Sequence, residues 1–360
     1  MAGDKEIEVE DFATIAQTNN ILGSSINGGG GGSEYVAKIQ AVSGGAREDL
    51  LTSYSSMEFI PITKVQQSIN NMEVLNNFLV GKGLYCRIGI VADPDDERIP
   101  FVYSARDFEN VTFGVVVNGT IVTTSVSITD SKGYWYTIGT TALSGNYLFC
   151  HTGSSNDTNT QYRIYKLNTS NNTLTAIAAY TGRNFKYPRS FSFVEKTGNY
   201  HYAYFDVSGT YRYICRLCVN EINDSCSYAK GVDASPTMYS QVLTQESNGT
   251  YSTFAMGSNH QASIRISSTW DYHSSQTSSL SLSYTPMTDY FVRCLIYGSN
   301  KCINVPMSTN IKDPSLYEIY TGKIIKTFNN NGKEGELINY KGDIWCTELN
   351  IAGNKYKKIT

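Results

Sequence analysis

The sequence predicts an all-β fold, a six-bladed β-propeller made of four-stranded antiparallel blades, and three observations support that prediction. Short runs rich in aromatic and β-branched residues alternate with turn residues along most of the chain. Turn glycines recur in phase at intervals of roughly 45–50 residues, at Gly145, Gly198, Gly249, Gly298 and Gly342. A second marker with the same period opens new units at Pro188, Pro236 and Pro286. Five or seven blades also fit this spacing.

The clearest unit lies between Tyr187 and Tyr228. Its four runs read RSFSFVEK, YHYAYFDV, YRYICRLCV and SCSYAKG, and the gaps between the first three include TGN and SGT. Runs of this kind predict strands, and gaps that contain glycine predict hairpins. The same pattern predicts further units that begin near residues 84, 134, 238, 290 and 336. In the unit that begins near residue 134, we expect the first strand at Tyr134–Thr140.

Composition excludes several functions. Charged residues make up 17% of the 360 residues and the net charge is −3, so there is no basic excess to hold a phosphate backbone. No apolar run approaches the roughly 18–20 residues that a membrane helix needs. The first residues, MAGDKEIEVEDF, are acidic and lack the layout of a signal peptide. We therefore expect that the protein is made in a cytosol. We expect neither nucleic-acid binding nor membrane insertion.

Residues 1–33 are predicted to form a flexible arm that contains five consecutive glycines, Gly28 to Gly32. Its apolar residues are too few to fold alone. They are Ile7, Val9, Phe12 and Ile15. Two interpretations stay open: the arm is a flexible tail or linker, or it docks on another protein subunit through these residues and anchors the chain in an assembly.

Residues 34–83 are predicted to contain a strand and an amphipathic helix. The strand is Met57–Thr63, where Pro61 suits an edge position. The helix is Val65–Val80, with Gly81 at its C-terminal end. One face of this helix carries Val65, Ile69, Met72, Leu75 and Leu79. Because the last unit ends one strand short, we expect Met57–Thr63 to pair with that unit and close the ring.

The eight cysteines are interpreted mainly as small buried residues. Cys302 and Cys346 each follow a turn glycine by four residues, at equivalent positions of two units. Cys215 and Cys218 form a C-x-x-C along a strand, where residues three apart face opposite sides. No second pair follows, so no zinc site is expected. A Cys218–Cys226 disulfide across a hairpin is the alternative for an oxidising environment.

Known catalytic motifs are absent. The four histidines are scattered singly, and the sequence has no G-x-S-x-G, no HExxH and no phosphate-binding loop. The acidic turn Asp93–Glu97 is interpreted as solvated, because it lacks the alternating ligands and the glycine of a calcium loop. No carboxylate pair of the kind that glycosidases use can be identified. We therefore predict that the protein is not an enzyme and uses no metal and no cofactor.

The best candidate for ligand or partner binding is the serine-rich stretch SSTWDYHSSQTSS, between the third and fourth strands of one unit. Trp270, Tyr272 and His273 lie there, where an aromatic side chain has little core to bury in. Exposed aromatics on loops often contact sugars or protein partners. The alternative is that Trp270 folds back onto the edge of its blade.

Two resemblances bear on function. The segment Tyr200–Asn220 resembles part of the sema propeller of plexins and semaphorins, in which a tyrosine-rich strand precedes an R-x-C strand, here within YRYICRLCVN. The whole chain resembles β-propeller proteins of bacteriophage tails in its low charge, its many Tyr, Ser, Thr and Asn residues, its glycine-jointed arm and its all-β body. The second resemblance implies a virion component in which the arm is the anchor and the propeller is a platform or host-contacting surface.

The sequence is therefore interpreted as a non-enzymatic structural protein of a virion, a tail or host-attachment component made in a host cytoplasm. Its expected partners are other virion or assembly proteins, bound through the arm in an oligomeric assembly, and a host surface protein or glycan. The alternatives are an extracellular sema-like protein-binding module and a carbohydrate-active propeller enzyme.

Overall fold

The computed structural model describes most of the chain from residue 58 onward, together with one short earlier strand. The described residues are 35–38, 58–104, 110–127, 139–152, 161–181, 191–207, 213–231, 238–257, 261–271, 277–281, 293–298, 300–305, 313–333, 335–348 and 351–359. The chain divides into two compact units, Met1–Asn70 and Asn71–Thr360. The predicted arm, residues 1–33, lies outside the described residues, so its docking stays a prediction.

In the first unit, β1 (Tyr35–Lys38) and β2 (Glu58–Pro61) form a two-stranded antiparallel sheet. The strand predicted at Met57–Thr63 is therefore present, and Pro61 lies at its end, opposite Tyr35. Its expected pairing with the last blade is wrong, because β2 pairs with β1. A partner that is near in sequence closes a shorter loop and costs less chain entropy than a partner at the far end of the chain.

The predicted helix is α3 (Ile62–Leu79), whose residues from Asn71 onward belong to the second unit. It ends next to Gly81, which has a φ of 77° and so takes the left-handed conformation that terminates many helices. No helix among the described residues has both the length and the apolar character needed to cross a bilayer.

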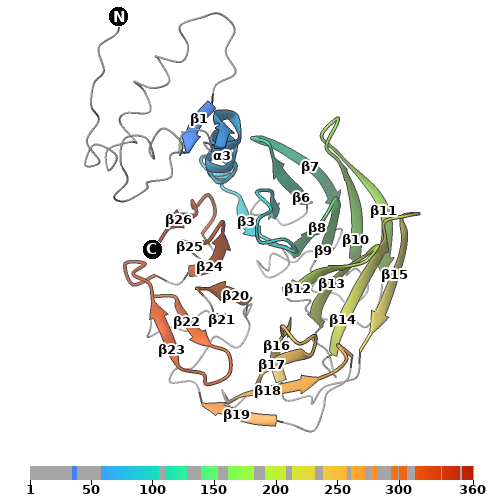
Figure 1. Cartoon of the computed structure of the whole chain (residues 1–360), viewed down its shortest axis with the longest axis vertical. Helices are drawn as coiled ribbons and strands as arrows, with labels where there is room; N and C mark the ends of the chain where they lie inside the picture. The colour runs from blue at the N-terminus through green and yellow to red at the C-terminus, as the bar shows by residue number, and fades with distance from the viewer. Residues whose placement is uncertain are drawn as a thin grey trace, which may run out of the picture. The chain divides into compact units, whose positions relative to one another are not determined.

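The second unit is a six-bladed β-propeller, which confirms the predicted fold class (Figure 1). The first three blades are four-stranded antiparallel meanders. Blade one is β3 (Tyr85–Ile88), β5 (Ile99–Ser104), β6 (Asn110–Val117) and β7 (Thr120–Ser127); blade two is β8 (Thr140–Ser144), β9 (Tyr147–Thr152), β10 (Gln161–Asn168) and β11 (Thr173–Thr181); blade three is β12 (Phe191–Thr197), β13 (Tyr200–Val207), β14 (Tyr213–Asn220) and β15 (Ser225–Lys230). The short strand β4 (Ile90–Val91) adds to blade two by pairing in parallel with β8.

Blades four and five repeat this pattern, and blade six has three strands. Blade four is β16 (Met238–Gln245), β17 (Tyr251–Gly257), β18 (Gln261–Ser267) and β19 (Thr277–Ser281); blade five is β20 (Arg293–Tyr297), β21 (Asn300–Val305), β22 (Ser315–Glu318) and β23 (Ile324–Thr327); blade six is β24 (Gly335–Tyr340), β25 (Asp343–Glu348) and β26 (Lys357–Lys358). In Figure 1 the strands β8, β12, β16, β20 and β24 lie nearest the ring centre, and β11, β15, β19 and β23 lie at the rim.

One first strand differs from its prediction. The first strand of blade two is β8, residues Thr140–Ser144, directly before the turn glycine, and not Tyr134–Thr140. Residues 134–138 lie outside the described residues. The run TTALS carries no aromatic residue, and its alanine and serine give a weak strand signal, so the more aromatic segment before it was preferred.

The recurring glycines perform the role that their phase predicts. Each joins the first and second strands of a blade and has a positive φ, which a residue without a Cβ adopts at least cost. The values are 53° at Gly145, 57° at Gly198, 84° at Gly249, 61° at Gly298 and 78° at Gly342. The repeat was therefore recognisable from the turns even though the strands share little sequence.

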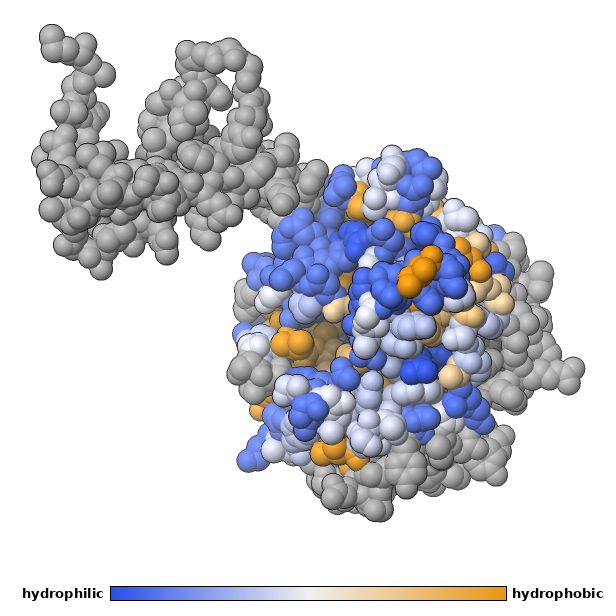
Figure 2. Space-filling view, turned by 45° about the vertical axis from the view of Figure 1, so that its right-hand side comes forward, coloured by the Kyte–Doolittle hydropathy of each residue, from blue (hydrophilic) through white to orange (hydrophobic). Residues whose placement is uncertain are grey.

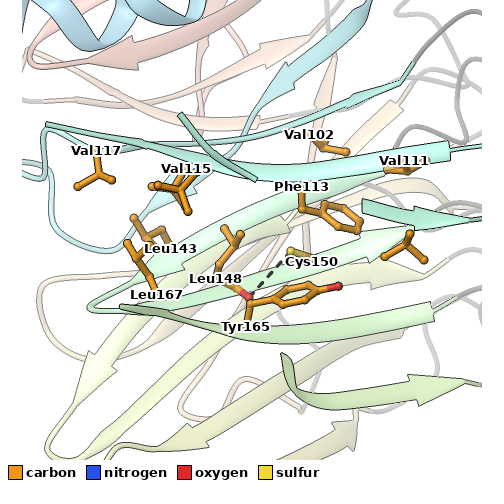
Figure 3. Close-up of a cluster of buried hydrophobic side chains, with 12 residues drawn as sticks. Val102, Val111, Phe113, Val115, Val117, Leu143, Leu148, Cys150, Tyr165 and Leu167 are labelled. Atoms are coloured by element: carbon orange, nitrogen blue, oxygen red, sulfur yellow. Dashed lines mark hydrogen bonds between the residues drawn. The ribbon is translucent and has the colours of Figure 1, made fainter. Parts of the chain in front are cut away.

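The hydrophobic core is divided among the contacts between neighbouring blades. Between blades one and two, valines and Phe113 of β5 and β6 pack on Leu143, Leu148 and Cys150 of β8 and β9 (Figure 3). Further clusters join blades two and three, blades three and four, and blades five and six. Cys302 and Cys346, the predicted equivalent pair, form no disulfide and are buried in the cluster between blades five and six. Each blade thus depends on its neighbours for its core.

The ring is closed between blades six and one by side chains of α3. Met72, Leu75 and Leu79 are almost fully buried in a cluster that contains residues of both blades. The side-chain amide of Asn76 donates to the Tyr356 carbonyl at 2.9 Å and accepts from the Tyr356 N–H at 2.8 Å. Asn71 makes the matching contacts to blade one, donating to the Glu97 carbonyl at 2.7 Å. Two helix amides therefore bond to the backbone on both sides of the junction, next to the blade that has only three strands.

Candidate functional site

The two ends of the ring differ in their connections. We call the end where β8, β12, β16, β20 and β24 finish the turn end; most of its connections are tight, such as 118–119, 145–146, 198–199 and 341–342. The other end, where these strands begin, is the long-connection end. Its connections include 128–139, 153–160, 182–190, 282–292 and 306–314. Binding residues concentrate where loops lie on a rigid scaffold, so the long-connection end is the first place to look for a site.

Buried charges gather at this same end. Among the described residues, the buried Arg, Lys, Asp and Glu side chains are Arg87, Asp206, Arg293 and Glu336. Arg293 is the first residue of β20 and Glu336 the second of β24, Asp206 is the penultimate residue of β13, and Arg87 lies further along its strand, third of the four residues of β3. Burying a charge is costly unless it is paired or used. Ion pairs at the turn end, such as Lys166–Asp224 and Lys196–Glu221, are partly exposed.

The centre of the candidate site is an ion pair between two inner strands. A guanidinium NH2 group of Arg293 on β20 lies 2.7 Å from the Glu336 Oε1 on β24, and the two side chains are 3% and 4% exposed. The pair therefore joins blade five to blade six, and both side chains are largely buried. Breaking such a pair leaves an uncompensated buried charge and costs about 3–5 kcal/mol.

Unpartnered polar atoms surround the pair. Asn304 on β21 stands directly opposite Arg293 in the register of blade five and is fully buried. Within the described part of the chain, neither amide atom of Asn304 has a hydrogen-bond partner, and neither does Nε of Arg293. Buried groups of this kind almost always bind something, a protein group, a water or a ligand.

Two weakly acidic groups face the same pair from blade one and from the C-terminal segment. Burial, and then the carboxylate of Glu336, raise the pKa of the Cys86 thiol and of the Tyr356 hydroxyl, so both groups stay protonated at neutral pH. The Tyr356 hydroxyl accepts a hydrogen bond from the Ile88 N–H at 3.2 Å. Cys86 is therefore no nucleophile here. Among the described residues, no three His, Cys, Asp or Glu side chains lie close enough to hold a metal ion.

A second polar group lies at the long-connection end between blades two and three. His151 on β9 is fully buried, and its ring contacts the Tyr162 ring at a centroid distance of 4.6 Å. Burial lowers the pKa of His151 well below its usual range, so the imidazole is neutral. Its two ring nitrogens have no hydrogen-bond partner among the described residues. Asp206 lies at the same end on β13.

The structure brings Ser144, His201 and Glu221 together at the turn end, which the sequence did not predict. The Ser144 hydroxyl lies 2.8 Å from His201 Nδ1, and His201 Nε2 lies 2.9 Å from a Glu221 oxygen. The order matches a nucleophile, a base and an acid. Ser144 and His201 are both buried, however, and the His201 ring lies against Gly145, so this pair belongs to the packing between blades two and three. We interpret this chain of hydrogen bonds as a contact between blades two and three.

The predicted ligand loop falls partly within the described residues. Trp270 is partly buried and folds back, as the alternative held, but onto the neighbouring blade three: its ring lies 5.7 Å from that of Tyr204 and 4.6 Å from the Arg216 guanidinium. Tyr272 and His273 lie outside the described residues, so their role in binding stays a prediction. Trp270 itself contributes to the contact between blades.

The cysteine alternatives are decided by the strand register. Cys218 pairs with Ser227 and Cys226 pairs with Val219, so the two side chains lie on opposite faces of the hairpin and cannot form the suggested disulfide. Both are free thiols. Cys215 contacts the Tyr228 hydroxyl at 3.0 Å.

In the acidic turn Asp93–Glu97, the Lys341 ammonium pairs with the Glu97 carboxylate at 2.6 Å, so a cation of the chain binds this carboxylate.

Sequence reasoning missed the candidate site because its residues come from different blades. Arg293, Asn304 and Glu336 are single residues of three different strands, and none belongs to a motif. The usable signal was a charged residue within the first strand of a unit. In a chain with so few charges, Arg293 in RCLIY and Glu336 in GELINY stand out on this criterion.

The described surface offers no single large apolar face. Figure 2 shows hydrophobic residues in separate patches among hydrophilic ones. The exposed large hydrophobic residues are Val80, Tyr200, Ile222, Ile266, Ile296, Tyr320 and Ile351. Scattered residues of this kind are normal on a soluble surface and do not indicate a docking face.

No family model and no curated protein matches the chain. Solved structures do match it. The α-L-arabinanase of Penicillium chrysogenum has 12% identity and a TM-score of 0.45 over 79% of this chain and 93% of its own. The α-L-arabinofuranosidase of Fusarium graminearum has 11% identity and a TM-score of 0.48 over 77% and 92%. The Trypanosoma rangeli sialidase has 10% identity and a TM-score of 0.43 over 76% of this chain and 52% of its own. The chain therefore spans about half of the sialidase.

Two expectations are corrected here. The sequence was interpreted as a non-enzymatic virion component, whereas these similar structures are carbohydrate-active enzymes. The resemblance to tail proteins rested on composition and general architecture, which many propellers share. At 10–12% identity the likeness describes the fold, so the activity has to be argued from the residues of this chain.

Proposed function

We propose that this chain is a carbohydrate-active propeller that cleaves glycosidic bonds at the long-connection end of its ring. The observation that carries the proposal is that three of the four buried charges of the described residues, Asp206, Arg293 and Glu336, lie at that end, two of them on inner strands. A purely structural ring has no need to bury charges there, because apolar residues of similar volume are at least as stabilising. Buried polar groups at the mouth of a rigid scaffold suit a polar ligand.

Glu336 is the carboxylate that this proposal places at the reacting bond. Glycoside hydrolysis needs carboxyl groups on two sides of the scissile bond, one acting as acid and the other as base or nucleophile. Arg293 holds one oxygen of Glu336 and so orients the carboxylate. Among the described residues, the other buried carboxylate at this end of the ring is Asp206 on β13.

The test incubates the full chain with a panel of substrates that includes arabino-oligosaccharides and sialosides. The released sugars are then measured by chromatography. Glu336→Gln keeps the shape of the side chain and removes its acid–base chemistry, so we expect the rate to fall on the order of 10²–10⁴-fold. Asp343→Asn is the matched control, because it breaks an exposed pair with Lys358 at the other end of the same blade. It should leave the rate unchanged.

Folding is checked by circular dichroism and melting temperature in every variant, because Glu336→Gln also weakens a buried ion pair. If Glu336→Gln does not fold, Arg293→Lys keeps the charge and loses the planar fork, and a reduced rate is expected. A folded wild-type chain that releases no sugar from the whole panel would refute the proposal. An active, folded Glu336→Gln would refute the role of Glu336.

A further inference from the structure

We propose that the cluster of Arg293, Asn304 and Glu336 binds the hydroxyl groups of a neutral sugar and not the carboxylate of an acidic one. The inference rests on the proposed function, because it names the substrate class of the same site. It follows from the hydrogen-bonding atoms that the cluster leaves unused and from the charge that it carries.

The unused atoms lie side by side. Arg293 and Asn304 face each other across β20 and β21, and residues opposite in an antiparallel pair project to the same side of the sheet. The NH2 group of Arg293 is bound to Glu336, which leaves its Nε–H. Asn304 presents one amide NH2 and one carbonyl oxygen, both without a partner among the described residues. The cluster therefore offers donors and an acceptor within one buried place.

The charge of the cluster is already balanced. Glu336 lies 2.7 Å from Arg293 and offsets its charge. The neighbouring Cys86 and Tyr356 are neutral, because burial and then Glu336 raise the pKa of each. Arg87 follows Cys86 on β3 and so projects to the other side of that strand. An acidic sugar would place a second negative charge beside Glu336, where like charges repel strongly in a buried site.

The acceptor on Asn304 discriminates further. A carboxylate has only acceptors, so it can satisfy Nε–H and the amide NH2 but leaves the Asn304 oxygen unpaired. A hydroxyl both donates and accepts. Two neighbouring hydroxyls can satisfy Arg293 Nε–H, the amide NH2 and the amide oxygen together. A sugar that carries such a pair and no charge satisfies these groups, and a further hydroxyl can donate to Glu336 Oε1, which makes no hydrogen bond among the described residues.

The experiment measures binding, which is independent of turnover. Arabinobiose is the neutral probe and N-acetylneuraminic acid the acidic probe, each titrated into the full chain by calorimetry. We expect arabinobiose to bind and the acid not to bind. Asn304→Leu is similar in volume and has no polar atom, so it should weaken arabinobiose binding about tenfold or more. The exposed Asn146→Leu at the turn end is the control and should bind as the wild type does.

A second readout separates binding from folding. Asn304→Leu removes two unpartnered buried polar atoms, so its melting temperature without sugar should be equal to or higher than that of the wild type. The inference is overturned if the acid binds instead, if Asn304→Leu binds arabinobiose normally, or if neither probe binds. If a neutral sugar binds at Asn304 but nothing is cleaved, the proposed function is wrong and this inference stands. If only acidic glycosides are cleaved, the proposed function stands and this inference is wrong.

Discussion

At the scale of the residue, a single carboxylate at the turn end joins blade three to blade two, and a second one bonds within blade three. Asp224, on the turn between β14 and β15, accepts hydrogen bonds from Lys166 Nζ at 2.8 Å and from the Tyr147 hydroxyl at 2.6 Å. These partners in blade two, Lys166 first, hold the pKa of Asp224 below its ordinary value of 3.8. Lys196 and then His201 hold the pKa of Glu221 below 4.5. Both carboxylates bind fewer protons in the folded chain than in the unfolded one.

These shifts predict acid sensitivity. A depressed pKa contributes stability that is fully present above the unfolded value and is lost as the pH falls through the folded value. The wild-type melting temperature should therefore drop as the pH falls below about 4.5. A double variant, Asp224→Asn with Glu221→Gln, should start lower at pH 7 and fall less steeply in acid. Parallel melting curves from about pH 7 to about pH 3 would contradict this.

At the scale of the element, α3 acts as a substitute for the missing strand beside blade six. Its Asn76 amide bonds to both backbone groups of Tyr356, as a neighbouring strand residue would. The apolar face of the same helix, Met72, Leu75 and Leu79, fills the junction. The helix therefore takes the place of a strand in ring closure: its apolar side chains fill the junction, and the side-chain amide of Asn76 supplies the hydrogen bonds to Tyr356.

We expect Asn76→Ala to lower the free energy of unfolding by about 1–3 kcal/mol, because two hydrogen bonds are lost and the Tyr356 backbone groups are left without them. Asn77→Ala is the matched control: it makes the same change one residue along the helix, at an exposed position. Urea unfolding at neutral pH measures both. Alanine favours the helix more than asparagine does, so helix propensity alone would raise the stability of both variants. Equal changes in the two variants would mean that the bonds to Tyr356 do not contribute.

At the scale of the whole molecule, the ring should depend on α3 and not on the strands that precede it. Removing residues 1–61 takes away β1 and β2, which pair with each other. Removing residues 1–79 also takes away three almost fully buried side chains from the cluster between blades six and one. Each large buried side chain of this kind contributes about 2–5 kcal/mol. Only the longer truncation should sharply lower the melting temperature.

Melting curves of the two truncated chains beside the full chain decide this point. If the shorter truncation already destabilises the ring as much as the longer one, then the segment before α3 is part of the closure after all. If neither does, the cluster around Met72 is dispensable.

The fold was predictable because its signals are local. A hairpin needs a residue that tolerates positive φ, and Gly145 and its counterparts supply it at each repeat. The strand β13 has the bounds of the run YHYAYFDV, because a run so rich in aromatic residues suits a sheet. The strand β8 was misplaced because Ala142 and Ser144 give no such signal, and its position is fixed by packing against blade one.

The candidate site was not predictable in the same way, because its signals are distant in the sequence. Arg293 and Glu336 become partners only when β20 and β24 lie beside each other in the ring. Asn304 is recognised as part of the candidate site only from the strand register, which places it opposite Arg293. The same holds for Ser144 and His201, which look like isolated residues until two blades meet. The exposed aromatic that sequence reasoning favoured, Trp270, packs on a neighbouring blade for the same reason.

The closing contact of the ring has a consequence for biosynthesis. Asn76 and Tyr356 are 280 residues apart, so a ribosome that adds 5–20 residues per second needs roughly 15–55 s between them. Early blades can stack on their predecessors as they emerge, because blades one and two, and blades two and three, share cores of their own. Blade one, however, has α3 beside it but lacks its contact with blade six until blade six has been synthesised. During that interval the last blade of another nascent chain fits the vacant place as well as its own, so crowded translation of this protein favours exchange of blade six between chains.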